Sequence, residues 1–434
     1  MKKALIISYY WPPAGGAGVQ RWLKFVKYLR LYGWEPIVFT PSNPESPETD
    51  ESLLKDIPEN TEVIKIPIWE PYTFYKRLQG KKKGERIQAA FLSEKKQNPF
   101  IENLSVWIRG NIFIPDARKF WIRPSVKFLV NRLRKEPVDV IISTGPPHTT
   151  HMIALQVSRT LGIPWIADFR DPWTQIDFYH DLKLSAAADK KHHRLERSVL
   201  EQADAVTVIS PSMATDFRGL FDRSYEVITN GYDEEDTVFS GVIETDSKFS
   251  IAHIGTLTGS RNPVSLWKAL SGLVNEMPEL QNDLEIKLVG KVDYSVTESL
   301  EAAGLGRFVK RTEYLPHSEV VKVQQQSQVL LLLINNTPNA KSILTGKFFE
   351  YMASGRPVLC IGPCDGDAAA ILKETETGLI SGFDDLEGAR ANIHHFYHLF
   401  KEGRLEVSGK NTARFSRKEL TGKMAAIMDS VIRK

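Results

Sequence analysis

The sequence lacks several features that would assign it to particular classes of protein. Its 434 residues include only two cysteines, Cys360 and Cys364, in the stretch CIGPC. No histidine or further cysteine stands near them, so the pattern argues against a metal site and against a disulfide framework. So low a cysteine count favours a reducing compartment.

The sequence also lacks an apolar run that could cross a membrane. No stretch approaches the roughly 18 apolar residues of a spanning helix. The basic start MKKALIIS resembles a secretory signal, but its apolar run, residues 4–7, is shorter than the roughly 7–15 residues that such a signal needs. We therefore expect a buried first strand at this position and a cytoplasmic protein.

The net charge is small, at +3, but positive charge is concentrated in one segment, residues 76–110. This basic insertion contains many lysines and arginines, followed by interleaved aromatic and isoleucine residues. It can be a solvated insertion, or a patch that binds anionic lipid headgroups or a phosphate-bearing acceptor. The second interpretation would place the protein peripherally on the inner face of a membrane. Because no nucleic-acid recognition motif accompanies the charge, we expect no nucleic acid partner.

Short apolar runs alternate with amphipathic helical patterns along almost the whole chain, which predicts buried parallel strands joined by helices. One set of runs precedes residue 232: KALIIS, EPIVFT, EVIKIP, DVIIST, PWIADF, AVTVIS and YEVITN. A second set follows residue 248: FSIAHIG, LEIKLVG, RFVKRT, QVLLLLI, RPVLCIG and TGLIS. The acidic, poorly periodic residues 232–248 between them are the natural linker. The pattern predicts an α/β protein with two doubly wound, Rossmann-like domains and a ligand cleft between facing carboxyl ends of their strands.

The length of the chain also favours two domains over one. We expect an N-terminal domain over residues 1–231, which includes the basic insertion, and a C-terminal domain over residues 249–412. An amphipathic helix within residues 413–434 is expected to pack back on the N-terminal domain.

The first predicted strand leads into a glycine-rich loop, YYWPPAGGAGVQRW. In this loop, Gly15, Gly16 and Gly18 precede a predicted helix that begins near Val19. Glycine lets the backbone come close to a ligand, and a helix start offers free N–H groups to anionic oxygen. The spacing is not the G-x-G-x-x-G of a dinucleotide site, and the aromatic and proline residues favour sugar stacking or a closing loop.

Polar residues also follow two later strands of the first half. His148 comes after DVIIST, at a strand end where ligands bind in such sheets. The next strand ends in ADFRDPW, which brings Asp168, Arg170 and Asp171 together. Charges at this position cost desolvation unless they pair with a ligand or with one another. The cluster can therefore be a catalytic site or an internal salt bridge.

Two features of the second half suit an anionic ligand. Gly255 and Arg261 lie in the turn AHIGTLTGSRNP, where close backbone approach, a helix start and a guanidinium favour a diphosphate. Lys347 and Glu350 are three residues apart in a predicted helix, so they can face the same side. They can form a surface ion pair. We favour the alternative that Lys347 meets phosphate and Glu350 accepts hydrogen bonds from vicinal ribose hydroxyls, because the helix starts at the carboxyl edge of the predicted sheet.

These motifs together resemble those of the GT-B glycosyltransferases, and most closely glycosyltransferase family four. GGAGVQR, which includes Arg21, resembles the family's glycine-rich loop, and VITNGYD resembles its NG-x-D linker motif. GKFFEYMASGRPVL is similar to its donor-site motif LEAMA-x-G-x-PV. The resemblance spans nearly the whole chain outside the basic insertion. It implies the GT-B fold, a nucleotide-activated sugar in the C-terminal domain and an acceptor in the N-terminal domain.

Two departures from the family pattern concern the donor site. Ser342 stands eight positions before Glu350, where the family has the first of two paired glutamates, which usually contacts the donor sugar. Thr256 replaces the arginine of the family's G-R-L motif, which leaves Arg261 and Lys347 to neutralise a diphosphate.

A third departure concerns the catalytic side. The resemblance implies catalytic residues at the end of the ADFRDPW strand, where many members have a histidine and this chain has Arg170 followed by Asp171. His148 is then the nearest imidazole, and Asp168 completes the expected set.

We therefore predict a glycosyltransferase that transfers a sugar from a nucleotide diphosphate sugar to a glycan or lipid-linked acceptor, as in polysaccharide biosynthesis. The family implies retention of anomeric configuration, and we expect neither a cofactor nor a metal because fixed cations take the metal's place. A nucleotide-sugar 2-epimerase of the same architecture and a non-catalytic sugar-nucleotide-binding protein are the alternatives. A nicotinamide dehydrogenase is the weakest interpretation, since neither half carries the dinucleotide fingerprint.

Overall fold

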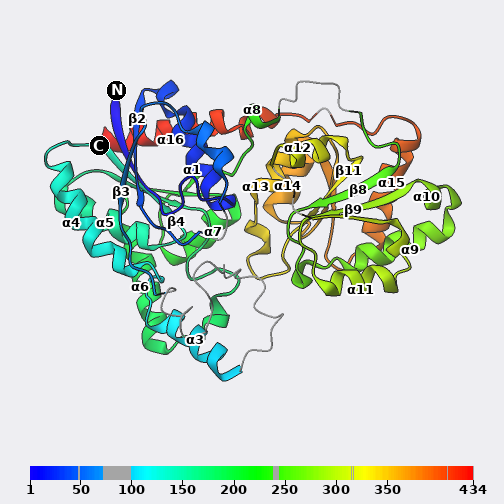
Figure 1. The fold of residues 1–434 in the computed structure, drawn as a ribbon, viewed down its shortest axis with the longest axis horizontal. Helices are drawn as coiled ribbons and strands as arrows, with labels where there is room; N and C mark the ends of the chain where they lie inside the picture. Colours follow the sequence, from blue (N-terminus) through cyan, green and yellow to red (C-terminus); the bar gives the residue numbers. More distant parts are fainter. Residues whose placement is uncertain are drawn as a thin grey trace. The chain divides into compact units, whose positions relative to one another are not determined.

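The computed structural model of the protein describes residues 1–46, 49–71, 99–237, 244–313, 315, 317–407 and 409–433. The chain divides into two compact units, an N-terminal unit of Met1–Thr229 with Arg417–Lys434 and a C-terminal unit of Asn230–Ser416. Each unit is a parallel sheet with helices on both faces (Figure 1). Most of the predicted basic insertion, residues 76–98, lies outside the described residues.

The sheet of the N-terminal unit has seven strands in the order β3-β2-β1-β4-β5-β6-β7, and every pairing is parallel. The strands are β1 (Lys2–Ile7), β2 (Trp34–Pro41), β3 (Glu62–Ile66), β4 (Val140–Gly145), β5 (Trp165–Phe169), β6 (Ala205–Val208) and β7 (Glu226–Val227). The helices are α1 (Ala17–Leu29), α3 (Pro99–Asn111), α4 (Ile122–Leu133), α5 (Thr149–Leu161), α6 (Ala186–Gln202), α7 (Pro211–Leu220) and α16 (Arg417–Ile432).

Alternation along the first strand shows how the sheet is buried on both faces. Leu5 and Ile7 belong to a core that includes side chains of α4 and α5, whereas Ala4 and Ile6 belong to the core on the opposite face. That second core includes Trp22 of α1 together with leucine and methionine side chains of α16. The last helix of the chain is thus part of the N-terminal unit, packed against α1.

The C-terminal unit has the same architecture, with six parallel strands in the order β10-β9-β8-β11-β12-β13. The strands are β8 (Phe249–Ile254), β9 (Leu284–Val289), β10 (Val309–Thr312), β11 (Val329–Leu333), β12 (Val358–Ile361) and β13 (Gly378–Ser381). The helices are α8 (Glu234–Thr237), α9 (Val264–Glu276), α10 (Pro278–Asp283), α11 (Tyr294–Ala302), α12 (His317–Gln326), α13 (Gly346–Ala353), α14 (Asp367–Thr375) and α15 (Leu386–Lys401).

Two cores also enclose this second sheet. Ile251 packs with side chains of α9 and α15, and Ala252, the next residue, packs on the other face with side chains of α13 and α14. The fold class expected from the sequence, two Rossmann-like doubly wound domains, is confirmed.

The boundary between the units lies earlier than the linker that we expected at residues 232–248. The C-terminal unit begins at Asn230. Tyr232 already belongs to it, since its N–H donates to the Phe415 carbonyl oxygen at 3.2 Å and its side chain is buried in that unit's core. A stretch without helical or strand periodicity can thus still be anchored by backbone pairing.

A helix that crosses a membrane needs about 20 consecutive, mostly apolar residues. None of the described helices combines the length and the apolar character that crossing a bilayer demands.

Candidate active site

In both units the strand order reverses next to the first strand, and this places most of the predicted site residues. β1 lies between β2 and β4 in the N-terminal unit, and β8 lies between β9 and β11 in the C-terminal unit. In open α/β sheets, ligands bind at the carboxyl ends of the strands on either side of such a switch point. The glycine-rich loop and His148 follow β1 and β4, and Gly255 and Lys347 follow β8 and β11.

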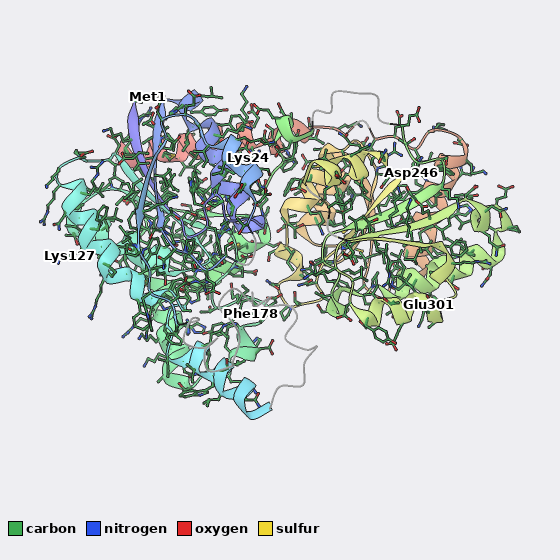
Figure 2. The ribbon with its side chains drawn as sticks, viewed as in Figure 1. Met1, Lys24, Lys127, Phe178, Asp246 and Glu301 are labelled. Carbon is green, nitrogen blue, oxygen red and sulfur yellow. The ribbon has the colours of Figure 1, made fainter. Side chains whose placement is uncertain are left out.

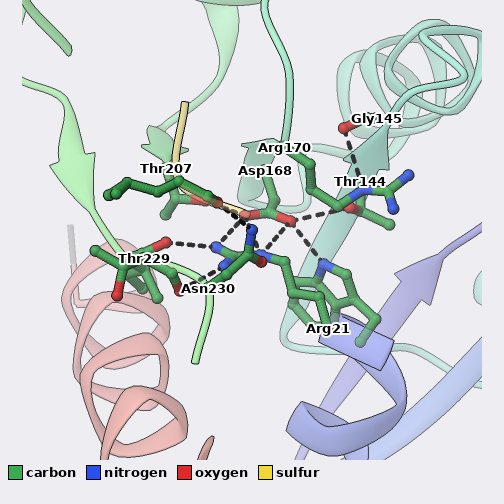
Figure 3. A network of polar contacts seen from close by, with 11 residues as sticks. Arg21, Thr144, Gly145, Asp168, Arg170, Thr207, Thr229 and Asn230 are labelled. Carbon is green, nitrogen blue, oxygen red and sulfur yellow. Dashed lines mark hydrogen bonds and ion pairs between the residues drawn. The ribbon is translucent and has the colours of Figure 1, made fainter. Parts of the chain in front are cut away.

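Asp168, at the end of β5, is a fully buried carboxylate whose oxygens are all occupied (Figure 3). One oxygen accepts from Arg21 Nη2 at 2.8 Å and from Thr207 Oγ1 at 2.8 Å. The other accepts from Trp22 Nε1 at 2.7 Å and from Thr144 Oγ1 at 2.9 Å. Side chains from α1, β4 and β6 therefore converge on one carboxylate in the middle of the sheet.

This environment fixes the charge of Asp168. Burial alone would raise the pKa of its carboxyl, but Arg21 and the hydrogen bonds outweigh burial and lower that pKa to about 2. Arg21 is buried as well, and its remaining donors bind the carbonyl oxygens of Thr229 and Ile228 at 2.8 and 2.9 Å. Asp168 and Arg21 thus pair with each other inside the unit, which fits the internal salt bridge that the sequence left open, and neither is exposed to a ligand.

Arg170, two residues after Asp168, ties three loops together (Figure 3). Its guanidinium donates to the carbonyl oxygens of Gly18 at 2.7 Å and Gly145 at 3.3 Å, and also to that of Pro146. A side chain at Gly18 would lie 3.2 Å from this guanidinium and 3.1 Å from the Tyr10 ring. The Arg170 guanidinium therefore holds the glycine-rich loop to the end of β4, and a side chain at position 18 would crowd that guanidinium.

The glycine-rich loop itself leads into α1 two residues earlier than the predicted start at Val19. Gly16 precedes the helix with φ of 89° and ψ of 172°, a conformation that only glycine adopts readily. Its neighbour Gly15 is buried. No side chain caps the start of α1, so its first N–H groups have no side-chain acceptor from the N-cap.

His148 and Asp171 are the predicted catalytic residues that face open space. Asp171 is exposed, and both residues line a pocket of about 490 Å³ in the N-terminal unit. The His148 ring stacks on the Trp173 indole, with ring centroids 4.5 Å apart and an interplanar angle of 2°. Burial, with help from His151 and Arg170, holds the pKa of His148 well below its usual range, so the imidazole is neutral.

The pocket combines aromatic and apolar walls with a few charged side chains. Its apolar lining includes Tyr10, Trp173 and Phe178, and Phe178 (labelled in Figure 2) is 43% exposed. Its charged lining includes Arg109 and Arg118 beside three carboxylates. Aromatic faces with interspersed hydrogen-bonding groups suit a ligand that is both flat and polar.

In the C-terminal unit, Lys347 occupies the first turn of α13 and reaches the end of β8. Gly255 has φ of +117°, and a side chain on it would lie 2.5 Å from Lys347 Nζ. Burial and the nearby Arg261 lower the pKa of Lys347 to about 8. Among the described residues, the Lys347 ammonium has no hydrogen bond or ion pair. Lys347 is thus a half-buried, unpaired cation at the start of a helix, and a bound anion would stabilise its charge.

Arg261 and Thr256 lie in the turn after β8, beside Lys347. The Arg261 side chain donates to the amide oxygen of Asn335, in the loop after β11, and this bond holds the guanidinium near the switch point. Thr256 is exposed. Arg261 lies close enough to Lys347 to disfavour the positive charge of that lysine.

Glu350 is half-buried on the second turn of α13. Among the described residues its carboxylate has no hydrogen bond or ion pair, although it lies near enough to Lys347 to favour that cation electrostatically. Ser342, by contrast, is buried, and its hydroxyl donates to the Asn339 carbonyl oxygen at 2.9 Å. The structure thus brings Gly255, Lys347 and Glu350 to one edge of the sheet and uses Ser342 to close a turn.

Several residues of the N-terminal pocket were not predicted from the sequence. Phe178 and His192 belong to no motif, Tyr10 was only one letter of the glycine-rich loop, and α6 carried no expectation at all. A usable signal existed in α6, because Asp189, His192 and Glu196 follow a spacing of three and four residues that places polar groups on one helix face.

Comparison with known families identifies the chain. A family model described as "Glycosyl transferase 4-like domain" matches residues 101–231, and one described as "Glycosyl transferases group 1" matches residues 251–398. Together the two matches cover more than half of the 434 residues. A search of curated proteins gives no significant match.

Solved structures with the same fold cover both units. Sucrose-phosphate synthase from Thermosynechococcus elongatus has a TM-score of 0.61 at 16% identity and covers 100% of both chains. HepE of Anabaena, solved with UDP-glucose, has a TM-score of 0.55 at 12% identity and covers 100% of this chain and 98% of its own. A putative UDP-N-acetylglucosamine 2-epimerase from Listeria monocytogenes has a TM-score of 0.55 at 12% identity, with 99% and 96% covered. With both its family matches and its two doubly wound sheets, the chain belongs to the GT-B glycosyltransferases of the group 1 type.

Proposed function

We propose that this glycosyltransferase moves a sugar from a nucleotide diphosphate sugar to a glycan or lipid-linked acceptor, with retention of anomeric configuration. The observation that carries the proposal is the unpaired Lys347 ammonium, half-buried beside Gly255 and Arg261 at the switch point of the C-terminal sheet. Keeping a half-buried cation without a partner costs free energy, and a bound diphosphate would offset that cost.

The donor's diphosphate would lie over Gly255, where the backbone leaves room, and against the start of α13. As the bond between sugar and diphosphate breaks, negative charge grows on the leaving oxygens. Lys347, Arg261 and the free N–H groups of α13 would stabilise that charge in place, without help from a metal ion. Thr256, exposed in the same turn, would contact the diphosphate through its hydroxyl or backbone.

The Glu350 carboxylate would bind the nucleoside end of the donor. It has no partner among the described residues, and two vicinal ribose hydroxyls are the donors that a free carboxylate binds best in a nucleotide. The Anabaena protein that was solved with UDP-glucose has the same fold, which supports a nucleotide sugar as the class of donor.

The pocket of the N-terminal unit would take the acceptor. Its aromatic walls suit the apolar face of a sugar ring, while Asp171 and the other charged groups suit its hydroxyls. Of the predicted catalytic residues, His148 and Asp171 line this pocket, whereas Asp168 and Arg170 hold its supporting loops in place. We therefore assign acceptor contact to His148 and Asp171.

Lipid-linked acceptors reside at membranes, and we propose that residues 76–110 bring the cytoplasmic enzyme to an anionic membrane surface. Each lysine or arginine near such a surface contributes about 1 kcal/mol, which salt screens. Changing Lys81, Lys82 and Lys83 to glutamine should reduce sedimentation with phosphatidylserine vesicles at low salt and leave donor binding unchanged. Wild-type protein that stays in the supernatant at low salt would contradict the membrane role.

The enzymatic proposal is tested in two steps. A thermal-shift screen over nucleotide sugars identifies the donor, because a ligand that binds the folded state raises its stability by mass action. The selected donor is then incubated with and without candidate acceptors. Sugar transfer that requires an acceptor supports the proposal. A donor epimer formed without acceptor would assign the chain to 2-epimerisation, and binding without any turnover would make it a non-catalytic binding protein.

A further inference from the structure

A chain of hydrogen bonds runs from the pocket wall to helix α3. The Trp173 indole Nε1 lies 3.0 Å from His192 Nδ1, and His192 Nε2 lies 3.2 Å from the Gly110 carbonyl oxygen. His192 belongs to α6 and is 3% exposed, and Gly110 belongs to the last turn of α3. The chain joins three segments that are far apart in the sequence.

The chemistry of these groups fixes the protonation state of His192. An indole N–H can only donate, so His192 Nδ1 must be the acceptor. The single proton of the neutral ring then sits on Nε2, where it is donated to the Gly110 carbonyl oxygen. Burial lowers the pKa of His192, which keeps the ring neutral and the chain intact.

The first member of the chain also supports the imidazole that faces the acceptor pocket. The Trp173 indole stacks flat on His148, with a 4.5 Å separation and a 2° angle. His148 has no hydrogen bond of its own to set its orientation, since its buried Nδ1 has no partner among the described residues. The Trp173 ring, held by its bond to His192, therefore fixes the orientation of the His148 imidazole in place of a hydrogen bond.

The same face of α6 holds the rest of this loop. Glu196 is buried, and its carboxylate accepts from the Thr174 N–H at 3.3 Å and from Thr174 Oγ1 at 2.5 Å. Asp189 accepts from the Tyr179 hydroxyl at 2.9 Å. Glu196 also accepts from the Trp173 N–H at 3.2 Å. The backbone at Trp173 is therefore held by α6, and the His192 bond sets the orientation of the indole.

We propose that His192 is a positioning residue for transfer, which holds Trp173 against His148 and couples the acceptor pocket to the docking of α3. The inference rests on the proposed function, because His148 matters only if the pocket takes the acceptor. It goes beyond that function by assigning a positioning role to α6, whose His192 lies at the wall of the same pocket.

The test compares two substitutions of His192. His192→Leu cannot accept from the indole, and we expect kcat for sugar transfer to fall roughly 10–100-fold, the loss that a displaced reacting group produces. His192→Gln can accept through its amide oxygen and donate through its amide nitrogen, so it should restore most of kcat. His193→Leu, at the exposed neighbouring position, is the matched control and should be neutral. Donor affinity should stay at the wild-type level in all three variants.

Trp173→Phe separates stacking from hydrogen bonding, because a phenyl ring can still cover His148 but has no N–H to donate. We expect it to resemble His192→Leu in kcat. Wild-type kcat in His192→Leu would overturn the proposal. So would a loss of kcat in His192→Leu that His192→Gln fails to repair, since that would mark a packing role alone.

A readout without turnover distinguishes failure of this inference from failure of the proposed function. In protein labelled with carbon-13 at histidine Cε1, the His148 signal is assigned from the His148→Asn spectrum. Wild type should keep His148 neutral from pH 8 to pH 5. His192→Leu should free the ring and let it titrate, although the charge of Arg170 opposes protonation, while the neighbouring His151, with a pKa of about 3, stays neutral. An unchanged His148 titration in His192→Leu would refute the positioning role even in a protein that shows no transfer.

Discussion

The two units place charged side chains at equivalent edges of equivalent sheets, yet they use them in opposite ways. In the N-terminal unit the buried charges are satisfied by one another, as with Asp168 and Arg21. In the C-terminal unit Lys347 and Glu350 are half-buried and have no hydrogen bond or ion pair to any described residue. The first arrangement holds loops in place, and we propose that the second binds a ligand.

The contrast shows that a charge near a sheet edge is evidence of binding only when its hydrogen-bonding capacity is unused. Asp168 accepts four hydrogen bonds at 2.9 Å or less, so it has no lone pair left to offer. The Lys347 ammonium has three donors and no acceptor among the described residues. Removing each kind of charge should therefore affect different properties of the protein.

The largest effect is expected from Asp168→Asn, which leaves the buried Arg21 guanidinium without its counter-charge. Breaking a buried ion pair by removing one partner costs about 3–5 kcal/mol of folding free energy. Tryptophan fluorescence during urea unfolding measures it, because every tryptophan except Trp267 lies in the N-terminal unit. Asp171→Asn, three residues later and exposed, is the control and should leave the midpoint in place. Equal stability of both variants would show that the Asp168 pair is dispensable.

A smaller effect, on binding and not on folding, is expected from Lys347→Ala. A hydrogen bond to a charged group contributes about 1.5–3 kcal/mol, so affinity for a nucleoside diphosphate should fall about 10–150-fold. Unfolding should shift little or move toward higher stability, since the lysine has no partner to lose. Calorimetry with Lys268→Ala, an exposed position on α9, provides the control. Diphosphate affinity that survives the loss of Lys347 would remove the basis for the donor site.

Arg261→Ala should weaken diphosphate binding less, by about tenfold, because part of its guanidinium is engaged by Asn335. The bare nucleoside should bind almost as before, since the side chain is proposed to meet only phosphate. The comparison requires two titrations of the same variant, one with nucleoside and one with nucleoside diphosphate. Equal losses in both would mean that Arg261 supports the loop after β8 and contacts no phosphate.

The smallest effect concerns pH. The pKa of Lys347 is about 8, and a bound diphosphate would raise it. Affinity for a nucleotide sugar should thus be constant below pH 8 and fall above it, by at most tenfold for each pH unit. Lys347→Arg keeps its charge throughout this range and should abolish the slope. A wild-type affinity that is flat from pH 7 to pH 9.5 would contradict the assignment.

The fold was predictable because burial on both faces leaves a strong mark on parallel strands. The β11 sequence VLLLL and the β12 sequence VLCI are continuous apolar runs, and each is a strand in the predicted position. The boundary at Asn230 was less predictable, because the pairing of Tyr232 with Phe415 joins residues almost 200 positions apart.

The sequence placed the side chains of the candidate site at strand ends but did not indicate which of them have partners. Strand ends marked His148, Asp168 and Lys347 equally well. The three residues differ in the hydrogen-bond partners that other elements provide. Arg21 and Thr207 reach Asp168 from other elements, and such long-range contacts leave no mark in the local sequence. The support of His148 by Trp173 and His192 was missed for the same reason.

The central claim, that unused charges of the C-terminal unit bind a nucleotide, is tested most directly by calorimetry on Glu350→Ala. The donor's nucleoside diphosphate is titrated into wild type, into Glu350→Ala and into Asp171→Ala, an exposed carboxylate of the N-terminal unit. We expect at least tenfold weaker binding for Glu350→Ala alone, because ribose hydroxyls bonded to a carboxylate contribute about 1.5–3 kcal/mol each. Wild-type affinity in Glu350→Ala would contradict this claim and make Glu350 an ordinary solvated helix residue.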